Sequence, residues 1–192
     1  PLAEPFTLGV SSSAALGAAL AIVLDWGVPG IPTDWLIPAN AFVFALGTLL
    51  LLQLLAQWRG AQAQTLVLFG IAIGFAAGAL LSLLQFVASE DALQQLVFWN
   101  MGSLARAHWQ SVAVLAVVVC VTLPFSWRAA RQLTCLRLGE ERARGFGIDV
   151  ASLRRWSLVR ISLLAGCAVA FIGTVGFVGL VGPHVARMLV GD

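Results

Sequence analysis

The chain has 192 residues, of which 60% are hydrophobic and 10% are charged, and its mean hydropathy is +0.94. Soluble domains carry about 25% charged residues, so this composition excludes a water-soluble surface, and a chain this apolar does not remain disordered. The net charge is +2 and all 11 cations are arginine, which excludes the broad basic face of a nucleic-acid-binding protein. The composition therefore indicates an integral membrane protein.

Five uncharged stretches have about the 20 residues that a transmembrane helix needs. They cover residues 7–24, 35–57, 65–88, 109–127 and 161–182. They are apolar on every side, whereas barrel strands alternate apolar and polar residues. We therefore predict an all-α fold, a polytopic membrane helix bundle, with one transmembrane domain over residues 1–192. Residues 92–104 are too short to span, and we expect them to form a short helix at the outer interface.

Two sets of small residues favour close helix packing. Glycine recurs at every fourth residue in the third span and at every third residue in the last, at Gly70, Gly74 and Gly78 and at Gly173, Gly176 and Gly179. In lipid, helices associate through such surfaces because their backbones can approach closely. Packing within the chain is the simpler interpretation, and a dimer face is the alternative. Pro183 follows the second set and is expected to break or kink the helix.

The arginines indicate which side faces the cytoplasm. Alternating spans put residues 58–64 and 128–160 on one side, and these two segments hold nine of the 11 arginines. Cytoplasmic loops carry an excess of arginine and lysine. We therefore expect this side to be cytoplasmic, the first span to run outward, and the chain to end outside.

No group of residues indicates catalysis. His108 and His184 stand alone at span ends, outside any HExxH pattern, and the three cysteines are scattered. A Walker-type phosphate loop requires lysine, and the chain has none. We expect no catalytic residue, no cofactor and no metal site.

The arginine-rich loop 128–160 is longer than the other gaps and has its own pattern. Residues 139–144 read as helical, and Gly145 and Gly147 end that pattern. Apolar Leu136, Leu138, Phe146 and Ile148 alternate with the charges, which favours a cytoplasmic docking surface over a plain solvated loop that only sets the topology.

These residues resemble the FecCD family, which comprises permease subunits of binding-protein-dependent ABC importers for iron-siderophores, haem and cobalamin. The resemblance lies in Leu138-Gly139-Glu140, Ala143 and Gly145-Phe146-Gly147, and in the segment from Gly173 to Arg187. Residues 1–12 and 98–104 match as well. Phe146 stands where leucine is usual in the family, and Gly182 where a larger aliphatic residue is usual.

The resemblance implies a ten-helix permease of which these five spans are the third to seventh, so that the chain is an internal piece. It implies alternating-access import of a metal chelate, for which we expect an iron-siderophore, across a bacterial plasma membrane. The implied partners are cytoplasmic ATP-binding subunits, an external substrate-binding protein and a second permease subunit in a homodimer. The permease itself would not be an enzyme. The alternative is a secondary transporter or channel without an ATPase.

The loop 128–160 falls where the family's coupling helices contact the ATPase. The residues expected in that contact are Leu138, Gly139, Glu140, Arg142, Ala143, Arg144, Gly145, Phe146 and Gly147.

Overall fold

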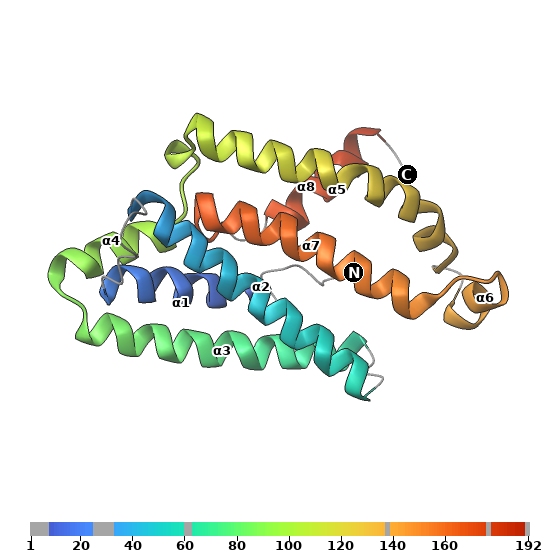
Figure 1. Cartoon of the computed structure of the whole chain (residues 1–192), viewed down its shortest axis with the longest axis horizontal. Helices are drawn as coiled ribbons and strands as arrows, with labels where there is room; N and C mark the ends of the chain where they lie inside the picture. Colours follow the sequence, from blue (N-terminus) through green and yellow to red (C-terminus); the bar gives the residue numbers. More distant parts are fainter. Residues whose placement is uncertain (1–7, 25–32, 60–62, 137–138, 176–177, 191–192) are drawn as a thin grey trace. The chain divides into compact units, whose positions relative to one another are not determined.

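The computed structural model describes residues 8–24, 33–59, 63–136, 139–175 and 178–190 (Figure 1). These residues form helices and no strand, which confirms the all-α prediction. The helices are α1 (Val10–Val23), α2 (Thr33–Arg59), α3 (Ala63–Val87), α4 (Glu90–Asn100), α5 (Trp109–Leu136), α6 (Glu140–Gly145), α7 (Val150–Ile172) and α8 (Val178–Val190). A 3₁₀ turn covers Leu104–Arg106.

Four of the described helices are long and apolar enough to cross a membrane, and they cover Trp35–Leu55, Val67–Val87, Trp109–Leu136 and Val150–Ile172. Three of them correspond to predicted spans. The last predicted span, 161–182, is displaced, because the helix begins at Val150 and ends at Ile172. The described part of the first predicted span forms α1, whose 14 residues extend about 21 Å, less than the hydrocarbon thickness of about 30 Å.

The sequence predicts one domain over residues 1–192, and the packing divides the chain into two compact units. Unit 1 comprises Pro1–Ala107 and Gly166–Asp192, and unit 2 comprises His108–Ala165. Each unit is described by itself.

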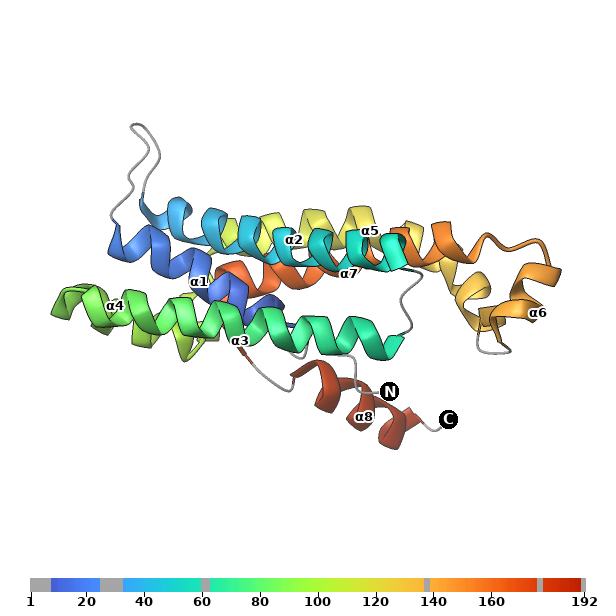
Figure 2. The same ribbon diagram turned by 90° about the horizontal axis from the view of Figure 1, so that it is seen from below.

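In unit 1, α1 is the central element and packs against α2, α3 and α4 (Figures 1 and 2). No residue of α1 is exposed, and Val10, Ala14, Ala18 and Ala19 are fully buried. A helix that is apolar on all sides is stable only when other elements surround it. The small side chains of α1 let those neighbours approach closely.

Glycines provide the closest contact between α1 and α3. A Cβ atom at Gly9, just before α1, would lie 2.5 Å from the carbonyl oxygen of Gly70 and 2.8 Å from the amide nitrogen of Gly74. A Cβ atom at Gly70 would lie 2.8 Å from the Cα atom of Leu8, whereas one at Gly78 would meet nothing within 4 Å. Gly70 and Gly74 therefore lie in a tight contact, and Gly78 lies in open space.

The predicted short helix at 92–104 corresponds to α4, which begins two residues earlier. The side chain of Ser89 caps it by accepting a hydrogen bond of 3.3 Å from the Ala92 amide. Glu90 and Asp91 occupy its first turn, where negative charge interacts favourably with the helix dipole.

The end of α7 is joined to the end of α4. Gly173 has a φ of +87°, and the backbone of residues 173–175 is not helical. The Thr174 hydroxyl donates to the carbonyl oxygen of Asn100, and the Ser103 amide donates to that of Ile172. A Cβ atom at Gly173 would lie 2.4 Å from the carbonyl oxygen of Trp99. Glycine is therefore required here both for the backbone conformation and for the close approach.

The helix does not break at Pro183, and the kink that is the other expected outcome stays a prediction. Helix α8 begins at Val178 and continues through residue 183 to Val190, and the helical run is interrupted earlier, from Gly173. The proline is the sixth residue of α8, so the amide it lacks costs one intrahelical bond near the start of the helix. Gly176 lies outside the described residues, and Gly179 lies in α8.

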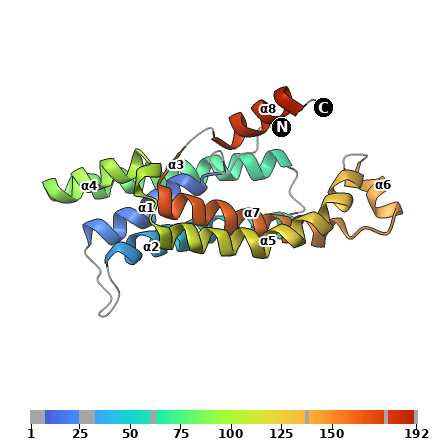
Figure 3. The same ribbon diagram turned by 90° about the horizontal axis from the view of Figure 1, so that it is seen from above.

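In unit 2, α5 and the first part of α7 lie side by side (Figures 1 and 3). The guanidinium group of Arg160 on α7 donates to the carbonyl oxygen of Phe125 on α5. It also donates to the carbonyl oxygen of Trp156, at 3.1 Å, and to the hydroxyl of Ser157, at 3.0 Å. One arginine side chain thus connects the two helices.

The glycine contact yields a prediction for stability. Gly70→Ala places a methyl group against the backbone of Leu8, so the purified permease should lose about 1–3 kcal/mol of stability, the usual cost of overpacking. Gly78→Ala, in the same helix and in open space, is the matched control and should not destabilise. Thermal unfolding in detergent measures both, and equal midpoints would contradict the tight contact.

Candidate functional site

The candidate site is the segment between α5 and α7, of which the structure describes residues 139–149. It contains α6, at the end of the helical hairpin that α5 and the first part of α7 form in unit 2 (Figures 2 and 3). The helix and glycine turn expected for this segment correspond to α6 and the turn that follows it. Leu138 lies outside the described residues.

The end of α6 is fixed by a Schellman motif. The Gly147 amide donates to the carbonyl oxygen of Arg144 at 2.9 Å, and the Ile148 amide donates to that of Ala143 at 3.1 Å. These are the two bonds of that motif, which places a left-handed residue after the helix. Gly147 has a φ of +78°, which side-chain-bearing residues rarely adopt. Gly147 thus ends α6 and reverses the direction of the chain.

The start of α7 is fixed by a capping side chain. Asp149 accepts a hydrogen bond of 3.1 Å from the Ser152 amide, and its carbonyl oxygen accepts one of 2.9 Å from the Leu153 amide. Aspartate is a strong N-cap residue. The sequence interpretation missed this role, although an aspartate directly before an apolar helical pattern is a start signal.

These two caps determine which side chains the segment presents. Ala143 is fully buried, whereas the Phe146 side chain is 69% exposed. Arg142 and Arg144 are also exposed. Phe146 occupies the C-cap position of α6, between the buried alanine and the partly buried Ile148, so its ring projects from the turn. The segment therefore presents one aromatic ring beside two guanidinium groups.

Three further residues predicted for this segment lie at the two ends of α6. Gly139 is the N-cap residue of α6, with a φ of +107°, and Glu140 is the first residue of the helix. Gly145 is the last residue, and a Cβ atom there would meet nothing within 4 Å. Within the described ranges, no group of three or more His, Cys, Asp or Glu side chains could hold a metal ion.

Comparison with known proteins identifies the family. The model of the FecCD transport family matches residues 1–192. The chain belongs to the FecCD transport family. The resemblance inferred from the sequence motifs is thereby confirmed.

FecCD relatives are similar along the whole chain. The haemin transport system permease protein of Yersinia pestis is 36% identical over 191 residues, covering 100% of this chain and 57% of its own length. A siderophore transport system permease protein of Bacillus subtilis is 35% identical over 199 residues, with the same coverage. This chain thus spans a little over half the length of these curated relatives.

A solved ABC transporter structure has the same fold. It is an inward-facing conformation of a metal-chelate type ABC transporter, with a TM-score of 0.86 and 33% sequence identity. The match covers 100% of this chain and 60% of that one. The fold is therefore that of an ABC permease, as the sequence predicts.

The Schellman motif predicts that Gly147 cannot be replaced without cost, and Gly145, two residues earlier, is the control. Gly147→Ala forces a side chain into the left-handed region, at a cost of about 1–2 kcal/mol. This should fray α6 and lower the affinity of any partner that binds it. Gly145→Ala, at a helical position in open space, should leave the segment intact or stabilise it. Hydrogen exchange of residues 139–149 measures the difference, and equal protection in both variants would contradict the assigned role of Gly147.

Proposed function

We propose that this chain forms part of the permease subunit of an ATP-driven importer that takes up a metal chelate, specifically an iron-siderophore, by alternating access. The main support for this proposal is that the FecCD family model matches the whole chain. A relative named for siderophore transport and a similar structure described as a metal-chelate transporter support the cargo class. In this role the permease binds and moves its cargo, and a partner hydrolyses ATP.

The proposed orientation places residues 128–160 in the cytoplasm of a bacterial cell and the permease in the plasma membrane. It rests on the asymmetry of the arginines, nine of which fall on one side of the alternating spans. An external substrate-binding protein then delivers the chelate to the opposite face, and a second copy of the permease completes the pathway.

The proposed coupling contact is the segment with α6. A cytoplasmic ATP-binding subunit would receive Phe146 in an apolar groove, with Glu140, Arg142 and Arg144 around it. Leu138 would enter the same groove beside Phe146, while Gly139, Ala143, Gly145 and Gly147 shape the contact. Buried aromatic anchors commonly contribute 2 kcal/mol or more to an interface, and charges at the rim contribute much less. Exposure of the ring supports this assignment.

A secondary transporter or channel without an ATPase is the alternative, and the family match does not favour it. Uptake by a deletion strain carrying the full-length permease distinguishes the two. We expect ATP-dependent uptake of radiolabelled iron-siderophore in excess of haem and cobalamin. Uptake that persists with a catalytically inactive ATPase would overturn the proposal. Uptake of haem or cobalamin alone would overturn only the cargo.

The coupling contact yields a prediction for Phe146. Phe146→Asp in the full-length permease should abolish both uptake and stimulation of the ATPase, because a carboxylate cannot occupy an apolar groove. Phe146→Leu, which restores the residue usual in the family, should retain most of both activities. Arg142→Ala should have a milder effect.

The control for this series is docking of the binding protein on the opposite face, together with the amount of permease in the membrane. Both should be unchanged in all three variants. Normal transport by Phe146→Asp would mean that the segment only sets the topology.

A further inference from the structure

A cavity lies between α5 and α7 in unit 2, apart from the exposed face of α6. Its volume is about 470 Å³, within the range of roughly 300–1,000 Å³ that accommodates small ligands. Apolar side chains such as Val121, Phe125 and Leu163 line much of it. The rings of Phe125 and Trp156, which also line it, are more than half exposed. The cavity is therefore a groove that a ligand can enter from the surface of the hairpin.

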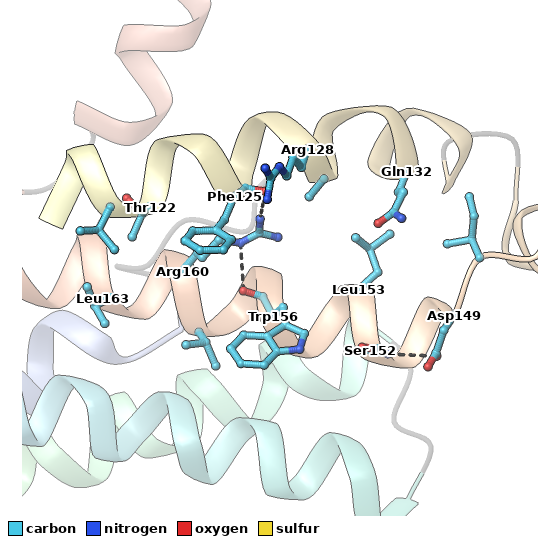
Figure 4. Close-up of a pocket in the computed structure, with 14 residues that line it drawn as sticks. Thr122, Phe125, Arg128, Gln132, Asp149, Ser152, Leu153, Trp156, Arg160 and Leu163 are labelled. Atoms are coloured by element: carbon cyan, nitrogen blue, oxygen red, sulfur yellow. Dashed lines mark hydrogen bonds between the residues drawn. The ribbon is translucent and has the colours of Figure 1, made fainter.

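Two guanidinium groups, from Arg128 and Arg160, line this groove (Figure 4). Arg160 uses three of its five N–H donors in the bonds to Phe125, Trp156 and Ser157. Arg128 makes no hydrogen bond or ion pair with any residue that the structure describes. The acidic residue in the lining, Asp149, caps α7 through the Ser152 amide. The groove therefore carries a positive charge that these side chains leave uncompensated.

The polarity of the groove changes along its length. Figure 4 shows Leu163 and Thr122 at one end, Arg160 and Arg128 in the middle, and Gln132 and Asp149 at the other end. Helix α5 has 28 residues, about 42 Å, and the hydrocarbon core is about 30 Å thick. Counting about 20 residues from Trp109 places Arg128 at the boundary. The apolar end thus lies at hydrocarbon depth and the polar end lies beyond it.

We propose that this groove binds an anionic phospholipid, with the phosphate at Arg128 and Arg160 and the start of an acyl chain along Val121, Phe125 and Leu163. Basic pockets between transmembrane helices are typical sites for anionic head groups. Guanidinium groups match phosphate with paired hydrogen bonds. Tryptophans favour the interface. Trp127 directly precedes Arg128 in the sequence, and Trp156 lines the groove. The proposal is independent of cargo and of the ATPase.

Native mass spectrometry of the purified full-length permease tests the site. Phosphatidylglycerol and phosphatidylcholine with identical acyl chains serve as probes, because both carry a phosphate and only the first is anionic. The wild type should retain phosphatidylglycerol preferentially. Arg128→Gln should reduce this retention about fivefold, since a basic residue near the surface contributes about 1 kcal/mol and 1.4 kcal/mol is tenfold.

Arg131→Gln is the matched control. Arg131 lies on the same helix three residues later, is exposed, and does not line the groove. Retention of phosphatidylglycerol by this variant should equal that of the wild type. Equal losses in both variants would mean diffuse attraction to the basic end of the hairpin and would overturn the site. Displacement of the lipid by millimolar inorganic phosphate would overturn the phospholipid as its occupant.

Quenching of Trp156 fluorescence locates the acyl chain. Phosphatidylglycerol brominated on its chain should quench the wild type more than Trp156→Phe, which lacks the indole ring lining the groove. Equal quenching would mean that the lipid binds elsewhere. Absence of preferential retention in the wild type would overturn the proposal as well.

Discussion

In hydrocarbon, a backbone amide or carbonyl group without a partner costs several kcal/mol, because no water is present to replace it. This constraint explains why the described residues form helices and why the ends of α4 and α7 are bonded to each other. At the end of α7, the Thr174 hydroxyl and the Ser103 amide each satisfy a carbonyl group that a helix end leaves open. The last carbonyl groups of α4 and α7, at Asn100 and Ile172, therefore both have partners where the two helix ends meet.

The segment between α5 and α7 lies outside the apolar spans, and its helix ends are also closed by hydrogen bonds within the chain. Gly147 closes α6 with two backbone bonds, and Asp149 opens α7 two residues later. A short helix with satisfied ends can hold a side chain in one direction without a hydrophobic core of its own. Phe146 is exposed because it is the C-cap residue of α6, directly before the turn at Gly147.

Much of the fold was predictable from the sequence, because apolar runs of about 20 residues have few alternatives in a membrane. The family motifs were equally informative. Helix boundaries were not predicted well, since charge marks the edge of the hydrocarbon and not the end of a helix. Helix α7 begins at Val150, and Arg154, Arg155 and Arg160 lie within it. Caps such as Asp149 set these ends. The groove beside Arg128 depends on how two helices meet, which no local pattern contains.

The 14-residue α1 has a consequence for how the protein responds to its bilayer. A helix of about 21 Å in contact with lipid would force the membrane to thin around it. No residue of α1 is exposed, because α2, α3 and α4 surround it. Hydrophobic mismatch therefore acts on the longer helices α2 and α3, which can tilt to accommodate it. A change in acyl-chain length is therefore accommodated by the tilt of α2 and α3, and the bilayer thickness does not act directly on α1.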